Sequence, residues 1–297
     1  MDSFEMKVMN TTFYIEISNS VISDWKDIIS ELLRYFEREF SRFQTNNELW
    51  RFNQLERDLT AVVSPVLYDL LEKADEYHRK TEGRFSPYLL SELVAHGYDQ
   101  SFPFEASKNS FVPIDYQIES QPLIFHRNCK ITKKTEQKID LGGIAKGYAV
   151  AAIAQWLKKD AHSKFGMVDG GGDIALWSNG EKTWNIGVMD PFNEEKELGS
   201  FEIQNGGIAT SNIVYRSWWQ DGTRKHHLLD GRTGLPVEPK IVQATVVSQH
   251  CLDAEIGAKI CFMEDPITVK NVLKTISHKF NFVLIKPDGQ IVRGGGQ

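Results

Sequence analysis

The sequence has few cysteines, no excess of basic residues and no long apolar run, and each absence excludes a class of protein. Its 3 cysteines are too few and too scattered for a disulfide framework or a cysteine-based zinc site, so we expect reduced thiols. The 34 basic residues against 40 acidic ones give a net charge of −6, whereas a general nucleic-acid binder needs a basic face to neutralise phosphates. No apolar stretch approaches the roughly 18 residues of a membrane span.

Targeting and linker segments are also missing from the sequence. Residues 1–5 lack the basic and apolar regions of a secretory signal, and no cysteine near the start is placed to carry a lipid. We therefore expect a cytoplasmic protein without a lipoprotein signal. Because no repeat, low-complexity stretch or composition break divides the chain, we expect a single domain over residues 1–297, with a disordered tail at residues 294–297.

The sequence does contain an ordinary balance of 41% hydrophobic and 25% charged residues in short periodic segments, which indicates a folded α+β protein. Alternation and glycine turns predict strands at 7–18, 123–126, 130–133, 165–168, 174–177, 184–189, 243–248, 280–285 and 291–293. Helical spacing, with caps such as Ser64 before Pro65, predicts helices near 23–40, 65–77, 144–159, 253–263 and 266–276. We expect antiparallel sheets with flanking helices.

The segment DLGGIAKGY, residues 140–148, places a glycine turn directly before a predicted helix. Glycines let the backbone approach a ligand closely, and the N-terminus of the helix offers free N–H groups to a phosphate. Lys146 adds a positive charge in the first turn. Because the segment matches neither the P-loop nor the dinucleotide fingerprint, a phosphate-binding loop and a simple strand-to-helix turn are both open interpretations.

Three further polar segments are candidates, each with a plainer alternative. The DGGGD run at residues 169–173 indicates either a close approach or a hairpin turn, and the turn is favoured. Residues 207–212 carry adjacent hydroxyls and residues 226–236 carry two histidines, an aspartate and an arginine, which suit acid–base chemistry or a well-formed turn. Asp253 starts a predicted helix, where a carboxylate either stabilises the helix end or ligates Mg²⁺.

Six segments of the chain then form one ordered pattern. They are MNT at residues 9–11, a stretch ending in RFN at 41–53, DLGGIAKGY at 140–148, DGGGDI at 169–174, GIATS at 207–211 and HLLDGRTGLP at 227–236. Together they resemble the FAD:protein FMN transferases of the ApbE type, and the resemblance spans residues 5–293. It implies an ApbE-like, T-fold-related architecture: a single α+β domain with antiparallel sheets and flanking helices.

This resemblance also implies an activity and its site. The family transfers FMN from FAD to a Ser or Thr hydroxyl of an acceptor protein, using Mg²⁺ and releasing AMP, so the implied partners are FAD and a flavin-acceptor protein. His227 would be the base, Asp253 would be catalytic through Mg²⁺, and the metal positions would be Asp253, the Gly143 carbonyl and Gly257. FAD would be bound by Phe43, Asn53, Gly143, Lys146 with the amides after Gly143, Asp173, Thr210, Ser211, Asp230 and Arg232.

The sequence departs from the family pattern at several of these positions. Gly257 stands where the family has a metal-ligating threonine, and we expect this change to weaken the activity. Gly231 replaces a proline, and residues 83–88 (GRFSPY) lack a carboxylate and a hydroxyl of the family's corresponding motif. Asn212 replaces a frequent glycine and Asn47 a frequent serine.

Two alternatives to the transferase follow from the same residues. A FAD pyrophosphatase would keep the site but use water as the acceptor, giving FMN and AMP. A non-catalytic FAD-binding module would keep the flavin contacts but lose turnover through the missing polar groups.

Overall fold

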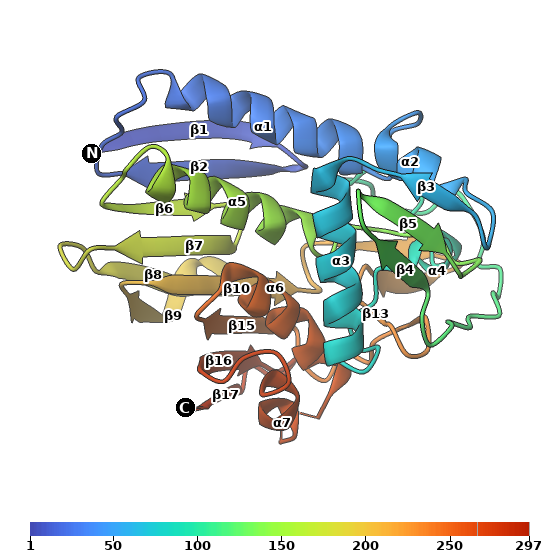
Figure 1. The fold of residues 1–297 in the computed structure, drawn as a ribbon. Coiled ribbons are helices and arrows are strands. Elements are labelled where there is room, and N and C mark those ends of the chain that lie inside the picture. The colour runs from blue at the N-terminus through green and yellow to red at the C-terminus, as the bar shows by residue number, and fades with distance from the viewer. Residues whose placement is uncertain (266, 297) are drawn as a thin grey trace. The chain divides into compact units, whose positions relative to one another are not determined.

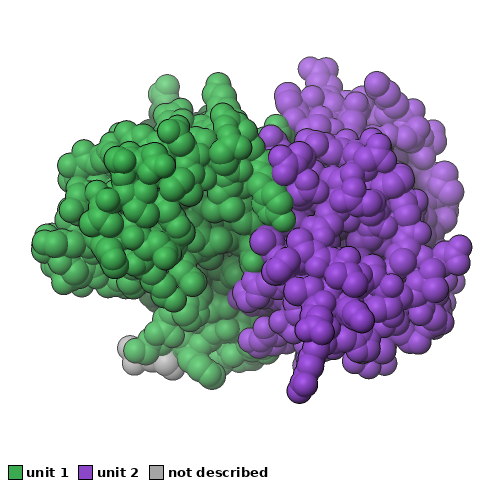
Figure 2. All heavy atoms as spheres, turned by 45° about the horizontal axis from the view of Figure 1, so that its top comes forward, with its two compact units in different colours: residues 1–36, 146–214, 239–297 green, residues 37–145, 215–238 purple. Residues whose placement is uncertain are grey.

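The computed structural model describes residues 1–265 and 267–296, which form two compact units (Figure 2). Unit 1 contains residues 1–36, 146–214 and 239–297, and unit 2 contains residues 37–145 and 215–238. Each unit is therefore assembled from segments that are far apart in the sequence. The expected single domain over 1–297 stays a prediction.

Unit 1 is built on an eight-stranded antiparallel sheet in the order β1-β2-β6-β7-β10-β15-β16-β17 (Figure 1). Its strands are β1 (Asp2–Val8), β2 (Thr11–Ile17), β6 (Phe165–Asp169), β7 (Asp173–Ser178), β10 (Gly206–Asn212), β15 (Gln243–Ser248), β16 (Phe280–Ile285) and β17 (Ile291–Gly296). A separate hairpin is formed by β8 (Trp184–Asp190) and β9 (Asn193–Ile203). The helices are α1 (Trp25–Phe40), which begins in this unit, α5 (Ala145–Lys159), α6 (Cys251–Ile260), the 3₁₀ turn η1 (Cys261–Met263) and α7 (Val269–Leu273).

The two faces of this sheet carry different partners. Helix α6 packs over β10 and β15 (Figure 1). Val246 lies against Gly257 of this helix, so its cross-strand partner Ala209 is on the same face. On the other face Ile174 and Ile208 form a buried cluster with Trp184 and residues of the β8–β9 hairpin. Because side chains alternate along a strand, each position of β10 is assigned to one face or the other.

Unit 2 combines short helices with small sheets. Its helices are α2 (Glu48–Asn53), α3 (Pro65–Lys80) and α4 (Leu90–Ala95). A three-stranded sheet has the order β3-β5-β4, and two ribbons follow. These strands are β3 (Thr60–Val62), β4 (Leu123–His126), β5 (Lys130–Lys133), β11 (Ser217–Gln220), β12 (Thr223–His226), β13 (Leu229–Asp230) and β14 (Leu235–Pro236).

Many sequence-based predictions of elements are confirmed. Strands β4, β5 and β15 have the predicted bounds, and the side chain of Ser64 caps α3 by accepting the N–H of Leu67 at 3.1 Å. The 280–285 and 291–293 hairpin is present as β16 and β17. The antiparallel sheets and their helices confirm the α+β class. Within residues 1–265 and 267–296, every helix is too short or too polar to span a lipid bilayer.

Three predictions of elements are wrong. The single strand at 7–18 is two strands, because Met9 and Asn10 adopt positive φ values of 53° and 57° and turn the chain into a hairpin. The last predicted helix is shorter, Val269–Leu273, and residue 266 of its expected span lies outside the described residues. The expected tail is a strand up to Gly296, paired with β16, because the edge of a sheet offers free backbone groups; residue 297 also lies outside the described residues.

Candidate functional site

A buried ion pair joins two of the predicted site residues in unit 1. Lys146 lies in the first turn of α5, Asp173 begins β7, and the Lys146 ammonium pairs with the Asp173 carboxylate. The two side chains are only 16% and 4% exposed. The pair places one cation and one anion at the end of the sheet, where an incoming phosphate can contact the lysine.

The glycine run at 169–173 is a hairpin turn between β6 and β7, as the favoured interpretation predicts. The Asp169 carboxylate accepts the N–H groups of Gly171 and Gly172 at 2.8 Å each, and burial raises the pKa of this carboxyl group. A Cβ at Gly171 would overlap the hydroxyl of Thr11, the last residue of the MNT motif. Both glycine residues have positive φ, so the turn and the close approach together explain them.

The adjacent hydroxyls of Thr210 and Ser211 do not point to the same face of the sheet. Thr210 shares its face with Thr245, whose hydroxyl is 2.8 Å away, and Ser211 lies on the opposite face, the one that carries Asp173 and α6. The expectation that both residues line one nucleotide site therefore conflicts with the register, and Ser211 is the one on the face of Asp173.

Helix α6 carries two carboxylates with different surroundings. Asp253, in the first turn, is 9% exposed, whereas Glu255 is fully buried. The Glu255 carboxylate accepts the N–H of Gly147 at 3.1 Å and pairs with Lys259 at 3.0 Å. Burial, and then the nearby negative charge of Asp173, raise the pKa of Glu255 to about 7. Sequence reasoning missed Glu255; the available signal was a charged residue, with Lys259 four positions later, inside an apolar helix.

Gly257 lies one helical turn after Asp253 on α6, and its place as a metal position stays a prediction. A Cβ on Gly257 would meet Leu273 at 3.0 Å, Val246 at 3.2 Å and Ile276 at 3.5 Å, which are all apolar side chains. A side chain at this position therefore points into the packed interior between α6, α7 and β15. A threonine at this position would have to displace these apolar side chains by a few tenths of an ångström.

Unit 2 carries the aromatic and local-turn part of the predicted site. The Arg42 guanidinium contacts two rings, 4.6 Å from the centroid of Phe43 and 4.1 Å from that of Tyr98, and lies 3.5 Å from the Asp140 carboxylate. Phe43 is 39% exposed and offers an accessible ring beside this cation. Phe43 therefore suits the flavin-stacking role, which stays a prediction.

Several polar groups around the DLGGIAKGY loop, which the sequence predicts to be available to a ligand, already form hydrogen bonds with the backbone. The amide of buried Asn53 exchanges two hydrogen bonds with the backbone of Ile139, at 2.7 and 2.8 Å, so its role is to hold the chain before the loop. The N–H groups of Ile144 and Ala145 donate to the Leu141 carbonyl at 3.0 and 2.8 Å. These two amides after Gly143 are therefore occupied by the turn, and the role of the loop amides in holding FAD stays a prediction.

Asp230 and Arg232 form a second ion pair, on the turn between β13 and β14. The Arg232 guanidinium donates to both oxygens of the Asp230 carboxylate, at 2.9 and 2.6 Å. Between them, a Cβ at Gly231 would lie 2.5 Å from the Cβ of Ser86 and would overlap the Gly83 carbonyl. Two departures from the family pattern, Gly231 and residues 83–86, are thus in direct contact.

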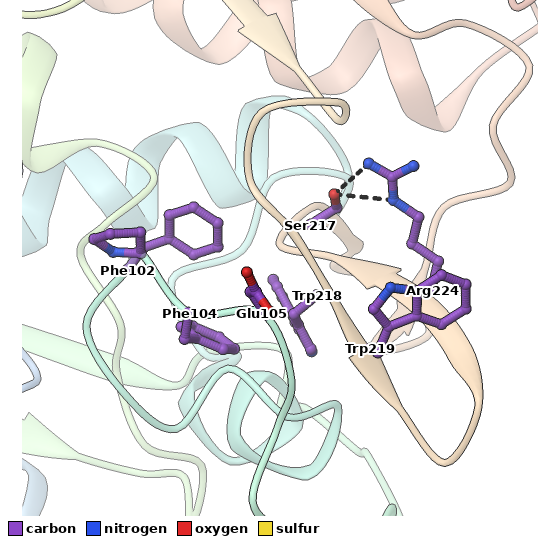
Figure 3. Close-up of a pocket in the computed structure, with 8 residues that line it drawn as sticks. Phe102, Phe104, Glu105, Ser217, Trp218, Trp219 and Arg224 are labelled. Carbon is purple, nitrogen blue, oxygen red and sulfur yellow. Dashed lines mark hydrogen bonds between the residues drawn. The ribbon is translucent and has the colours of Figure 1, made fainter.

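Two further features of unit 2 are the predicted base His227 and a pocket along β11. Nδ1 of His227 is 3.4 Å from the Arg216 carbonyl, and the side chain is half-buried. Sequence reasoning missed a pocket of about 560 Å³ along β11, which Phe102, Phe104, Trp219 and Arg224 help to line (Figure 3). The Arg224 guanidinium is held by two hydrogen bonds to Ser217, at 3.0 and 2.8 Å. The adjacent tryptophans at 218 and 219 were the available signal.

Comparisons with known proteins agree on one family. The model described as "ApbE family" matches residues 9–284. The chain is similar to the FAD:protein FMN transferase of Vibrio cholerae, with 26% identity over 261 residues, 83% of this chain and 76% of that protein. It is also similar to the FAD:protein FMN transferase of Treponema pallidum, with 26% identity over 250 residues, 78% of this chain and 69% of that protein.

Solved structures show the same fold. The ApbE protein of Thermotoga maritima superposes with a TM-score of 0.84 at 24% identity, covering 99% of this chain and 96% of that chain. The flavin transferase ApbE of Vibrio cholerae superposes with a TM-score of 0.76 at 22% identity, covering 100% and 97%.

Proposed function

Because the chain belongs to the ApbE family, we propose that it is an FAD:protein FMN transferase that moves FMN onto a Ser or Thr hydroxyl of an acceptor protein, with Mg²⁺, and releases AMP. The family match over residues 9–284 carries the proposal. The buried Lys146–Asp173 pair supports it, because a lysine held in place needs no reorganisation when a pyrophosphate binds.

The proposed reaction is a displacement at phosphorus. The acceptor oxygen forms a bond to the FMN phosphorus, the bridging P–O bond to AMP breaks, and AMP leaves with that electron pair. The acceptor hydroxyl gives its proton to His227, our proposed base. His227 lies on the segment between β12 and β13, with Nδ1 3.4 Å from the Arg216 carbonyl, and imidazole is the side chain that most often takes up such a proton.

The other site residues receive roles consistent with their contacts. Lys146 and Arg232 would contact the FAD phosphates, Phe43 would stack on the flavin ring, and Ser211 lies on the face of Asp173. Asp230 orients Arg232 through its bidentate contact. Asn53 would support FAD binding by holding Ile139 before the glycine loop.

The residues that are present fit Mg²⁺ at a site with a single carboxylate. Within residues 1–265 and 267–296 no group of three or more His, Cys, Asp or Glu side chains gathers to hold a metal ion. Mg²⁺ needs no such group, because it takes one or two carboxylates and completes its shell with water and phosphate oxygens. Asp253, at the start of α6, would hold it, and the Gly143 carbonyl stays the proposed second ligand. When bound, the ion neutralises charge on the pyrophosphate.

The test is to incubate the purified protein with FAD, Mg²⁺ and an acceptor fragment that an active family enzyme flavinylates. We expect the acceptor to gain the mass of FMN with release of AMP, and the Lys146→Met variant to lose at least tenfold in kcat/KM. No mass gain beside an active control enzyme contradicts the proposal.

The same incubation without acceptor separates the alternatives. FMN and AMP produced from FAD alone would indicate a pyrophosphatase, and tight FAD binding without any turnover would indicate a binding module. We also propose a cytoplasmic location; the three cysteines are all unpaired, which suits a reducing compartment.

A further inference from the structure

Glu255 is a fully buried carboxylate that the proposed chemistry does not use. It lies on α6 between Asp253 and Gly257, and its two oxygens have different partners. Oε1 pairs with Lys259 at 3.0 Å, one helical turn along, and Oε2 accepts the N–H of Gly147 on α5 at 3.1 Å. The carboxylate therefore links two helices that come from distant parts of the sequence.

Packing alone does not explain a carboxylate at this position. Burying a carboxylate costs free energy that a leucine would not incur, although the ammonium groups of Lys259 and Lys146 offset part of that cost here. What a leucine lacks is the acceptor for Gly147. Gly147 lies in the first turn of α5, whose N–H groups have no partner within the helix. Glu255 thus acts as a cap supplied by another helix.

The residue next to Gly147 is Lys146, whose ammonium reaches Asp173. Fixing the Gly147 backbone fixes the direction in which the Lys146 side chain leaves α5. Gly147 also has to lack a side chain, because a Cβ there would overlap Oε2 of Glu255 and lie 3.1 Å from its Cδ. The close approach of α5 and α6 is therefore built around this hydrogen bond.

We infer that Glu255 is a positioning residue of the proposed transferase: by accepting the Gly147 N–H it fixes the first turn of α5 and holds Lys146 in the orientation that contacts FAD phosphate. The inference rests on the proposed function for the role of Lys146, but the hydrogen bond itself is independent of that role.

The test compares two double variants that differ only in the acceptor. Glu255→Gln/Lys259→Met removes the buried ion pair but keeps a side-chain carbonyl for Gly147. Glu255→Leu/Lys259→Met removes the ion pair and the acceptor. Because neither leaves an unpaired buried charge, both are expected to fold, and circular dichroism and urea unfolding verify this.

The first measurement is amide hydrogen exchange of Gly147 in protein labelled with ¹⁵N-glycine. We expect protection in the wild type and in Glu255→Gln/Lys259→Met, and exchange at least tenfold faster in Glu255→Leu/Lys259→Met. Equal exchange in the two double variants overturns the inference, whether or not the protein binds FAD.

The second measurement is the dissociation constant for FAD with Mg²⁺, from flavin fluorescence. We expect the glutamine variant to stay within about threefold of the wild type and the leucine variant to bind about tenfold more weakly. Adding Lys146→Met should cost about tenfold in the wild type but less than threefold in the leucine background, because Glu255 acts through Lys146. Additive losses would show a general structural role and overturn the inference. A wild type that does not bind FAD rejects the proposed function, and the exchange result then decides the hydrogen-bond claim alone.

Discussion

The predicted FAD-binding residues include two ion pairs, Lys146–Asp173 and Asp230–Arg232, which form in different ways. Lys146 and Asp173 are 27 residues apart in the sequence and both are buried, whereas Asp230 and Arg232 are two residues apart on one turn and are partly exposed. The first pair exists only when unit 1 is folded, and the second forms wherever the local turn forms. Burial makes the first pair sensitive to the loss of either partner, while solvent screens the second.

Breaking the buried pair should have the largest effect. Asp173→Leu leaves the Lys146 ammonium, 16% exposed, without its carboxylate, and we expect the free energy of unfolding to fall by about 3 kcal/mol. Urea denaturation measures this loss. The double variant Lys146→Met/Asp173→Leu should recover most of the stability but not the flavin transfer. A loss below about 1 kcal/mol for Asp173→Leu would show that water already screens the pair.

The next largest loss of stability is expected at Gly231, on the turn that carries the Asp230–Arg232 pair. Gly231→Ala places a Cβ against Ser86 and the Gly83 carbonyl, and we expect a loss of about 2 kcal/mol because backbone has to move. Gly289→Ala on the β16–β17 turn is a control for steric crowding, since no atom lies within 4 Å of its Cβ, although its positive φ adds a strain cost of about 1 kcal/mol. Thermal unfolding of both variants separates crowding from strain. Equal losses would contradict the role of the close approach.

Acid should lower the stability of unit 2, which carries the Asp230–Arg232 pair. Burial lowers the pKa of three histidines in this unit, His78, His96 and His226. The pKa of His96 falls to about 4, through burial and then the charge of Lys225. Above pH 6.5 the imidazole is neutral in both the folded and the unfolded chain. As the pH falls from 6.5 to 4, the unfolded chain takes up the proton first, so stability is lost over this window.

We expect His96 to contribute about 1–2 kcal/mol of that loss by pH 5, allowing for screening by solvent. His96→Phe keeps a ring against Phe111, on which the histidine stacks at 4.8 Å, and removes the proton site. Urea unfolding at pH 7 and pH 5 should therefore show a smaller difference for this variant than for the wild type. An unchanged difference would rule out His96 as a source of acid sensitivity.

The smallest stability effect should come from the exposed pair. Arg232→Gln removes a guanidinium that is 37% exposed, and we expect the free energy of unfolding to change by less than about 1 kcal/mol. The KM for FAD should nevertheless rise, by roughly tenfold, because a charge-assisted contact to phosphate is lost. Steady-state kinetics with varied FAD measure this. A large loss of stability with unchanged KM would contradict this prediction, because the exposed pair would then stabilise the fold rather than bind FAD.

The class of the fold and much of its local structure could be predicted from the amino-acid sequence alone. The bounds of β4, β5 and β15 and the Ser64 cap of α3 follow from local patterns, because alternation and capping act over a few residues. The family was also readable from six ordered motifs, and the family model confirms it.

The surroundings of single side chains became known only from the folded chain. Gly257 lies in a metal-binding pattern in the sequence, yet its Cβ direction leads to Leu273 and Val246. Glu255 is an ordinary charged residue in the sequence, yet it caps α5 through Gly147. The physical reason is the same in both cases: a motif specifies residue types along one segment, whereas contacts, burial and charge partners depend on which distant segment packs against it.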